Sequence, residues 1–188
     1  MMMDDGGDMH LGDQAAKVCV NSFLRRPSLK PTAFQTISGF MNNLVLAAHR
    51  PGDACVFYAA MVFLLKDRAA WAISGEMSVL LFSGGVLERS SSGSANSRMG
   101  LSPVCRPELC EPFRLSREEK ALLICSNPLL AAVSVQEIEA ALRESNGPAQ
   151  WQERILSRLN GPDEAVSMLC AFIPPPPRGL SALFSGRT

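Results

Sequence analysis

The chain contains few of the histidines that activate a serine or cysteine nucleophile in covalent catalysis. His10 and His49 are its only histidines, and a Ser-His-Asp triad or a Cys-His pair would need one of them beside the nucleophile. His49 stands next to Arg50 at the end of a predicted helix, where the helix dipole stabilises a cation, so we expect a structural role for it. No Gly-x-Ser-x-Gly segment is present. The glycine pair at 84–85 lacks the lysine and the following helix of a phosphate-binding loop, so it predicts a turn.

The cysteines argue against disulfides and zinc sites, and the charges argue against nucleic acids and membrane surfaces as partners. Six cysteines are scattered without a Cys-x-x-Cys pair or a histidine at metal-ligand spacing, which predicts reduced thiols. The 18 basic and 18 acidic side chains cancel, and no basic cluster stands out. Because nucleic acids and anionic membrane surfaces are recognised by clustered positive charge, we expect neither as a partner.

No targeting or membrane-spanning segment is visible. The N-terminus is acidic and has no cationic region before an apolar run, so we expect no signal peptide and a cytoplasmic location. The longest apolar run, 54–65, lies between Asp53 and Lys66 and is shorter than the roughly 20 residues that a membrane-spanning helix needs. It is predicted to be a buried strand.

The periodicity of apolar residues places the elements that must position any site. Helices are predicted at 12–26, which ends before Pro27, and at 32–49, which ends before Pro51. Ser134 and Glu137 form a capping-box pattern at the start of a third helix, and Trp151 lies on a fourth. Strands are predicted at 54–65, 69–74, 78–83, from 86, 108–115, 120–126 and 165–173.

The strands are grouped rather than alternating with helices, which predicts an α+β fold with helices on a mostly antiparallel sheet. We expect an acidic N-terminal segment at 1–11, one domain at 12–173 and a proline-rich tail at 174–188 that leaves the core in an extended form. The serine-rich segment 90–97 is predicted to be a mobile surface loop that buries nothing. Trp71 and Trp151 are predicted core residues.

Four segments, in order, resemble the metal-dependent protein phosphatases of the protein phosphatase 2C (PPM) type. Residues 4–16 look like that family's Asp-Gly-x-Gly-Gly-His segment and the helix start after it, with Asp4 on the metal-binding aspartate and Met9 on the histidine. Residues 71–85 look like its strand, Gly-Asp-Ser-Arg turn and strand. In this chain Glu76, Met77 and Ser78 replace the Asp, Ser and Arg of the turn.

The other two segments lie in the second half of the chain. Residues 120–134 resemble the family's Leu-Leu-x-x-Ser-Asp-Gly-Leu-Trp-Asp segment, with Asn127 on the metal aspartate, Pro128 on the glycine and Ala131 on the second acid. Residues 161–171 resemble the closing Gly-x-x-Asp-Asn-Ile-Thr strand, with Glu164 on the aspartate and Ala165 on the asparagine.

The resemblance implies a PPM-like α/β sandwich of two mostly antiparallel sheets flanked by helices, without the family's first strands. It also implies Mn²⁺ or Mg²⁺ as cofactor, Asp4, Glu76, Asn127 and Glu164 as the metal positions, and a phosphoprotein or a protein kinase as partner. Sheets that have lost strands expose backbone donors and acceptors, so a homodimer through an exposed sheet edge is a further hypothesis.

The same positions predict a weak metal site. Two hard divalent cations need several negative ligands, yet Asn127 is neutral, Glu164 is a longer substitute, and the family's upstream acidic motif and phosphate-binding arginine have no counterpart. We therefore expect a pseudophosphatase with a binding or regulatory role and name no catalytic residue. A weakly active Mn/Mg-dependent serine/threonine phosphatase is the first alternative. The second is an unrelated α+β interaction domain, in which the N-terminal aspartates only favour a helix start.

Overall fold

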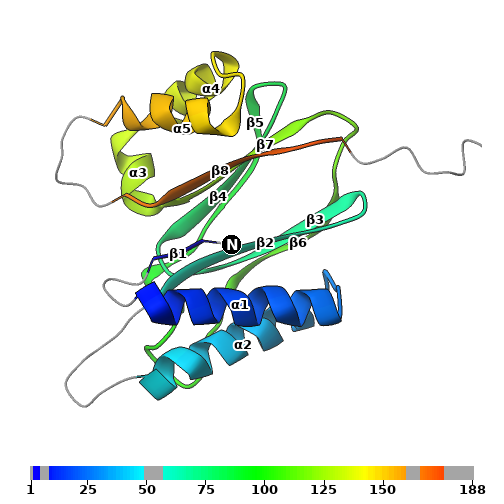
Figure 1. Cartoon of the computed structure of the whole chain (residues 1–188), viewed down its shortest axis with the longest axis vertical. Helices are drawn as coiled ribbons and strands as arrows, with labels where there is room; N and C mark the ends of the chain where they lie inside the picture. The colour runs from blue at the N-terminus through cyan, green and yellow to red at the C-terminus, as the bar shows by residue number, and fades with distance from the viewer. Residues whose placement is uncertain (1, 5–8, 49–56, 160–165, 176–188) are drawn as a thin grey trace, which may run out of the picture.

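A computed structural model describes residues 2–4, 9–48, 57–159 and 166–175, with two four-stranded antiparallel sheets between two layers of helices (Figure 1). The strands are β1 (Met2–Asp4), β2 (Tyr58–Leu65), β3 (Arg68–Ser74), β4 (Met77–Ser83), β5 (Val86–Ser92), β6 (Glu108–Arg114), β7 (Lys120–Ser126) and β8 (Met168–Ile173). The helices are α1 (Met9–Arg25), α2 (Pro31–Ala48), α3 (Asn127–Ala132), α4 (Val135–Arg143) and α5 (Pro148–Leu156), with the 3₁₀ turn η1 at Ala95–Ser97.

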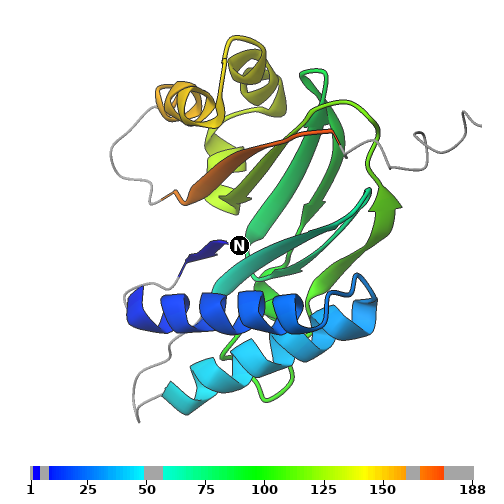
Figure 2. The same ribbon diagram turned by 45° about the vertical axis from the view of Figure 1, so that its right-hand side comes forward.

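The first sheet has the strand order β1-β2-β3-β6, and α1 and α2 cover its outer face (Figures 1 and 2). Every fourth or third residue along the two helices is apolar, and these residues pack on the sheet. Phe34 and Phe23 both stack on Phe63 of β2, with ring centroids 5.0 Å and 4.1 Å from it. The apolar stripes of the two helices therefore form one core with β2.

The second sheet has the order β5-β4-β7-β8, and α3, α4 and α5 cover its outer face. Trp151 of α5 is fully buried, meets Phe82 of β4 edge to face at 5.5 Å, and donates a hydrogen bond from Nε1 to the Ile138 carbonyl oxygen at 3.2 Å. Trp151 belongs to a second core beneath α3, α4 and α5, and a third core lies between the sheets and includes Trp71 of β3. The sequence predictions for both tryptophans are confirmed.

The expected α+β architecture of two mostly antiparallel sheets is also confirmed. β4 and β7 are continuous apolar runs because both faces of each strand are buried, one against the other sheet and one against helices. The capping box is present as predicted, since the Ser134 hydroxyl accepts from the Glu137 amide and the Glu137 carboxylate accepts from the Ser134 amide. The described cysteines are free thiols, as expected.

The prediction that residues 90–97 form a loop that buries nothing is wrong. Strand β5 continues to Ser92, and its serines pair with β4 from Leu80 to Ser78. Ser97 is buried in the turn η1. Serine is common in loops, but β5 is an edge strand with most side chains exposed, so hydroxyls cost nothing there while the backbone pairs with β4. Composition alone misled the prediction.

Several boundaries differ by a few residues from the sequence predictions, as is usual at frayed ends. The first helix begins at Met9, inside the segment 1–11 that was expected to precede the domain, and the last strand begins at Met168. Asn127 does not simply follow β7, because α3 begins there and Pro128 occupies its first turn, a position that suits proline.

Some predictions fall outside the described residues. These are the ones made for the N-terminal aspartates at 5 and 8, His49, Cys55, Glu164, Ala165, and the tail beyond residue 175. No helix in the described part of the chain is long and apolar enough to cross a bilayer. The cytoplasmic location stays a prediction.

Candidate functional site

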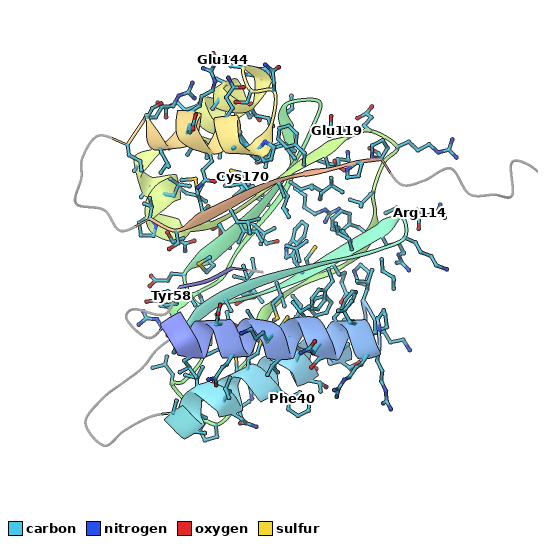
Figure 3. All side chains as sticks on the ribbon, in the orientation of Figure 1. Phe40, Tyr58, Arg114, Glu119, Glu144 and Cys170 are labelled. Atoms are coloured by element: carbon cyan, nitrogen blue, oxygen red, sulfur yellow. The ribbon has the colours of Figure 1, made fainter. Side chains whose placement is uncertain are left out.

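The β3–β4 turn lies at the end of the sandwich that carries the predicted site residues. Gly75 has a φ of +81°, a conformation that side chains with a Cβ avoid. A Cβ on Gly75 would lie 2.2 Å from Cδ1 of Tyr58, so the tyrosine ring packs directly on the turn. Figure 3 labels Tyr58 at this end of β2. Glycine at 75 therefore lets β2 and the turn approach closely, and this sets the position of the next residue, Glu76.

The Glu76 carboxylate faces a positive charge rather than other carboxylates. Its Oε2 accepts a hydrogen bond from Arg98 Nη2 at 3.3 Å, and the Tyr58 hydroxyl donates a long one at 3.5 Å. The Arg98 guanidinium also lies 5.6 Å from the centre of the Tyr58 ring. Both charged side chains are partly exposed, so the ion pair contributes little to stability. It does neutralise the one carboxylate at this turn.

Asn127 is held by the same turn and by a neighbouring hydroxyl. Its backbone N–H donates to the Glu76 carbonyl oxygen at 2.9 Å, which extends the β4–β7 ladder by one pair. Its side-chain Oδ1 accepts from Ser78 Oγ at 2.7 Å, and Ser78 Oγ lies 2.7 Å from Ser92 Oγ. A hydroxyl has one proton, so if Ser78 donates to Asn127 then Ser92 donates to Ser78. The result is a neutral polar network.

The segment after β5 is tied to the turn and delivers Arg98. Ser97 Oγ accepts from the Gly75 amide at 2.9 Å and donates to the Ser94 carbonyl oxygen at 2.9 Å. Gly93 donates its amide to the Met77 carbonyl oxygen at 2.9 Å. Sequence reasoning missed Arg98 and Ser97. A single arginine after a serine-rich stretch has no local signature, and its partner Glu76 is 22 residues away.

Three of the four predicted metal positions reach this end of the sandwich. The backbone of Asp4 pairs with Tyr58 in the β1–β2 ladder. The Tyr58 hydroxyl donates a hydrogen bond to the Glu76 carboxylate, and the Glu76 carbonyl oxygen accepts one from the Asn127 amide. The structure does not describe the Asp4 side chain, and Glu164 lies outside the described residues. Ser167, further along, exchanges hydrogen bonds with Ser126, the residue before Asn127.

The described donors do not fit a centre for two divalent cations. Within the described residues, no three His, Cys, Asp or Glu side chains lie close enough to hold a metal ion. Glu76 is paired with Arg98, and the Asn127 Oδ1 is neutral and accepts from Ser78. A cation bound here would have to break both contacts, and among the described side chains it would gain only one negative ligand.

The arrangement of sheets and helices matches solved structures closely, although no family model and no curated protein sequence matches the chain. The PPM Ser/Thr phosphatase MsPP of Mycobacterium smegmatis, solved with cacodylate, matches with a TM-score of 0.69 at 15% identity. The match covers 92% of this chain and 86% of that one. The protein has the fold of PPM-type serine/threonine phosphatases. The resemblance noted in the sequence is thus confirmed at the level of the fold, and the alternative of an unrelated α+β domain is wrong.

Two other proteins with the PPM fold bear on function. The catalytic domain of the serine/threonine protein phosphatase PstP, solved with two manganese ions, has a TM-score of 0.66 at 15% identity, over 91% of this chain and 86% of its own. PppA of Pseudomonas aeruginosa, described as a key regulatory component of T6SS, has a TM-score of 0.65 at 18% identity, over 91% of this chain and 84% of its own. The PPM fold therefore occurs both with bound manganese and in a regulatory component.

Proposed function

We propose that this protein is a PPM-fold pseudophosphatase, impaired in catalysis, that acts by binding or regulating another protein. The observation that carries the proposal is the state of Asn127, which the sequence resemblance aligns with the family's metal aspartate and which carries no negative charge. It is engaged instead with Ser78 at 2.7 Å. Phosphomonoester hydrolysis of this type depends on two cations that activate a water and clamp the phosphate, so the loss of charge acts on the chemical step itself.

The Glu76–Arg98 pair supports the same proposal. Arg98 Nη2 lies 3.3 Å from the Glu76 carboxylate, and at that distance its positive charge repels a divalent cation. A site with one neutral amide, several hydroxyls and an ion pair suits protein contact better than metal-assisted hydrolysis.

The proposed partner is a phosphoprotein or a protein kinase. PppA supports a regulatory role for this fold, since it is itself a regulatory component. The alternative is a weakly active phosphatase, in which Asp4 and Glu164 would hold Mn²⁺ or Mg²⁺ as metal positions of the PPM fold. Asp4 lies at the correct end of the sandwich by its backbone pairing with Tyr58, which makes it the residue to test.

The deciding experiment is a manganese titration by calorimetry, combined with an assay of aryl phosphate hydrolysis, on the wild type and on Asp4→Ala. We expect no micromolar binding and no turnover that Asp4→Ala abolishes, because too few carboxylates remain to dehydrate the ion. Micromolar binding together with Asp4-dependent turnover would instead establish an active phosphatase. Cooperative urea unfolding of both proteins ensures that a negative result comes from folded material.

A second experiment compares Asn127→Asp, which should gain affinity for manganese, with the control Asn127→Ala. The aspartate restores a charge at the β7–α3 junction next to Ser78, so manganese should bind more tightly to Asn127→Asp than to Asn127→Ala. Turnover should stay absent, because one restored carboxylate does not complete a two-metal centre. If Asn127→Asp alone gives Asp4-dependent hydrolysis, the rest of the centre is intact and only residue 127 separates the protein from an active enzyme.

A further inference from the structure

Strand β8 is an open edge of the second sheet. It lies at the end of the order β5-β4-β7-β8, and no described strand pairs with its outer side (Figures 1 and 2). Its six residues, Met168–Ile173, are all uncharged and apolar, and five of them are half-exposed. Natural sheets protect such edges with lysine, proline or a bulge, because free backbone groups pair with other chains. β8 has none of these protections.

The hydrogen-bond pattern identifies which amides of β8 point outward. Ser126 donates its amide to the Ser167 carbonyl oxygen at 2.9 Å, so Ser167 faces β7. In an antiparallel ladder, the direction of the backbone groups alternates with each residue. Met168, Cys170 and Phe172 therefore turn their N–H and C=O groups away from β7. The β4–β7 ladder gives the same alternation, since the Asn127 amide faces the Glu76 carbonyl oxygen.

The side chains of β8 continue both apolar layers to the open edge. Met168, Cys170 and Phe172 pack with the core beneath α4 and α5, whereas Leu169, Ala171 and Ile173 pack with the core between the sheets. Figure 3 labels Cys170 in the middle of this strand. A strand added beside β8 would therefore cover apolar surface on both faces and would pair three outward residues at once.

We propose that the occupant of this edge is a second copy of the same chain, paired antiparallel through β8 about a two-fold axis at Cys170. Cys170 is the middle of the three outward residues, so Cys170 lies opposite Cys170 of the second copy and Met168 lies opposite its Phe172. Each of these three pairs forms two backbone hydrogen bonds, six in all. The second sheet of one copy and the second sheet of the other then form one continuous sheet of eight strands.

A second copy fits this edge because an antiparallel pair of identical strands closes under two-fold symmetry. β8 carries no charge, so the pairing brings no like charges together. Residues of β2 share the inter-sheet core with Leu169, Ala171 and Ile173 of β8, so that face of β8 already rests on the first sheet.

The size of the edge sets the strength of the dimer. Six residues at about 3.3 Å each give an edge of about 20 Å, and two sheets about 10 Å apart, with their side chains, give a width of about 20 Å. Each copy then buries about 400 Å², and the total of about 800 Å² is below the roughly 1,200 Å² of a standard stable interface. We therefore infer a weak dimer that forms with rising concentration.

Sedimentation of the full chain from about 1 µM to about 1,000 µM tests the pairing. The wild type and the matched control Cys170→Ser should pass from monomer to dimer. Cys170→Lys and Cys170→Glu should each stay monomeric, because the register sets two like charges directly opposite each other. An equimolar mixture of the two variants should dimerise again, which also shows that both are folded. Charge variants that behave like the wild type overturn the proposed register.

Hydrogen exchange of the wild type gives a readout that needs no substitution. The amides of Met168, Cys170 and Phe172 should exchange fast at the lowest concentration and become protected as the dimer forms. Protection that is independent of concentration in a monomer means that another part of the same chain covers β8, and the proposal is then wrong. A strict monomer with fast exchange at every concentration overturns it too. Neither outcome depends on manganese, so this test is separate from that of the proposed function.

Discussion

At the residue scale, the candidate site is defined by Asn127 and Glu76 and by the side chains that contact them. Asn127 keeps the hydrogen-bond geometry of a residue at the end of β7, with the Ser78 hydroxyl at 2.7 Å, but supplies no negative charge. Glu76 keeps a carboxylate but pairs it with Arg98. The backbone path is thus that of the PPM fold, while the side chains favour neutral and paired contacts.

The β3–β4 turn yields a prediction at the same scale. Gly75→Ala should destabilise the protein by about 3 kcal/mol or more, because a positive φ costs roughly 1–2 kcal/mol for alanine and its Cβ would clash with Tyr58. Gly84→Ala is the matched control, since Gly84 has a φ of +57° but a Cβ added there would meet no atom within 4 Å. It should lose only about 1–2 kcal/mol. Urea unfolding measures both, and equal losses would show that the contact with Tyr58 is unimportant.

At the element scale, helix α4 shows how a short sequence pattern fixes a boundary. Ser134 and Glu137 satisfy each other's backbone amides, so the helix begins after Ser134. The hydrogen bonds from the Ser134 hydroxyl and amide lower the pKa of Glu137, which is exposed. This is a local device that needs no other element, and the sequence predicted it correctly. Strand β5 is the opposite case, because its serines form a strand only where β4 supplies a partner.

The capping box has a consequence for the pH dependence of stability. Because the pKa of Glu137 is lowered on folding, its contribution is complete above the unfolded value of about 4.3 and is lost as the pH falls through the lower folded value. Glu137→Gln should therefore flatten the acid side of the stability curve. Glu153→Gln, at an exposed carboxylate of α5, should leave it unchanged. Urea unfolding between about pH 3 and pH 7 checks this, and parallel curves for Glu137→Gln and wild type would count against it.

At the scale of the whole molecule, stability rests on three apolar layers. One lies beneath α1 and α2, one between the sheets, and one beneath α3, α4 and α5. Buried thiols belong to the outer layers, and burial raises the pKa of Cys19 and of Cys125 to about 12. Both thiols are therefore neutral in the folded protein over the whole range in which a free thiol ionises.

The buried thiols predict a loss of stability in alkali. Above about pH 8.5 the unfolded thiols ionise while the folded ones stay neutral, so stability falls as the pH rises towards 12. Cys125→Ala should reduce the slope of unfolding free energy against pH by roughly 1.4 kcal/mol per unit. Cys110→Ala should change it less, because Cys110 is only partly buried. Urea unfolding under reducing conditions gives the slopes, and identical slopes for Cys125→Ala and wild type would falsify the prediction.

The sequence by itself determined most of the elements and the class of fold. Helix and strand periods, the capping box and the four PPM-like segments are local patterns, and local sterics and burial decide them. The tertiary structure alone decided that Arg98 neutralises Glu76 and that Ser78 binds Asn127 across 49 residues. It also decided that, among the described strands, β8 lies at the edge of its sheet. Such contacts depend on which strands lie side by side and in which register. No periodicity encodes this, because pairing is settled by the packing of the whole sandwich.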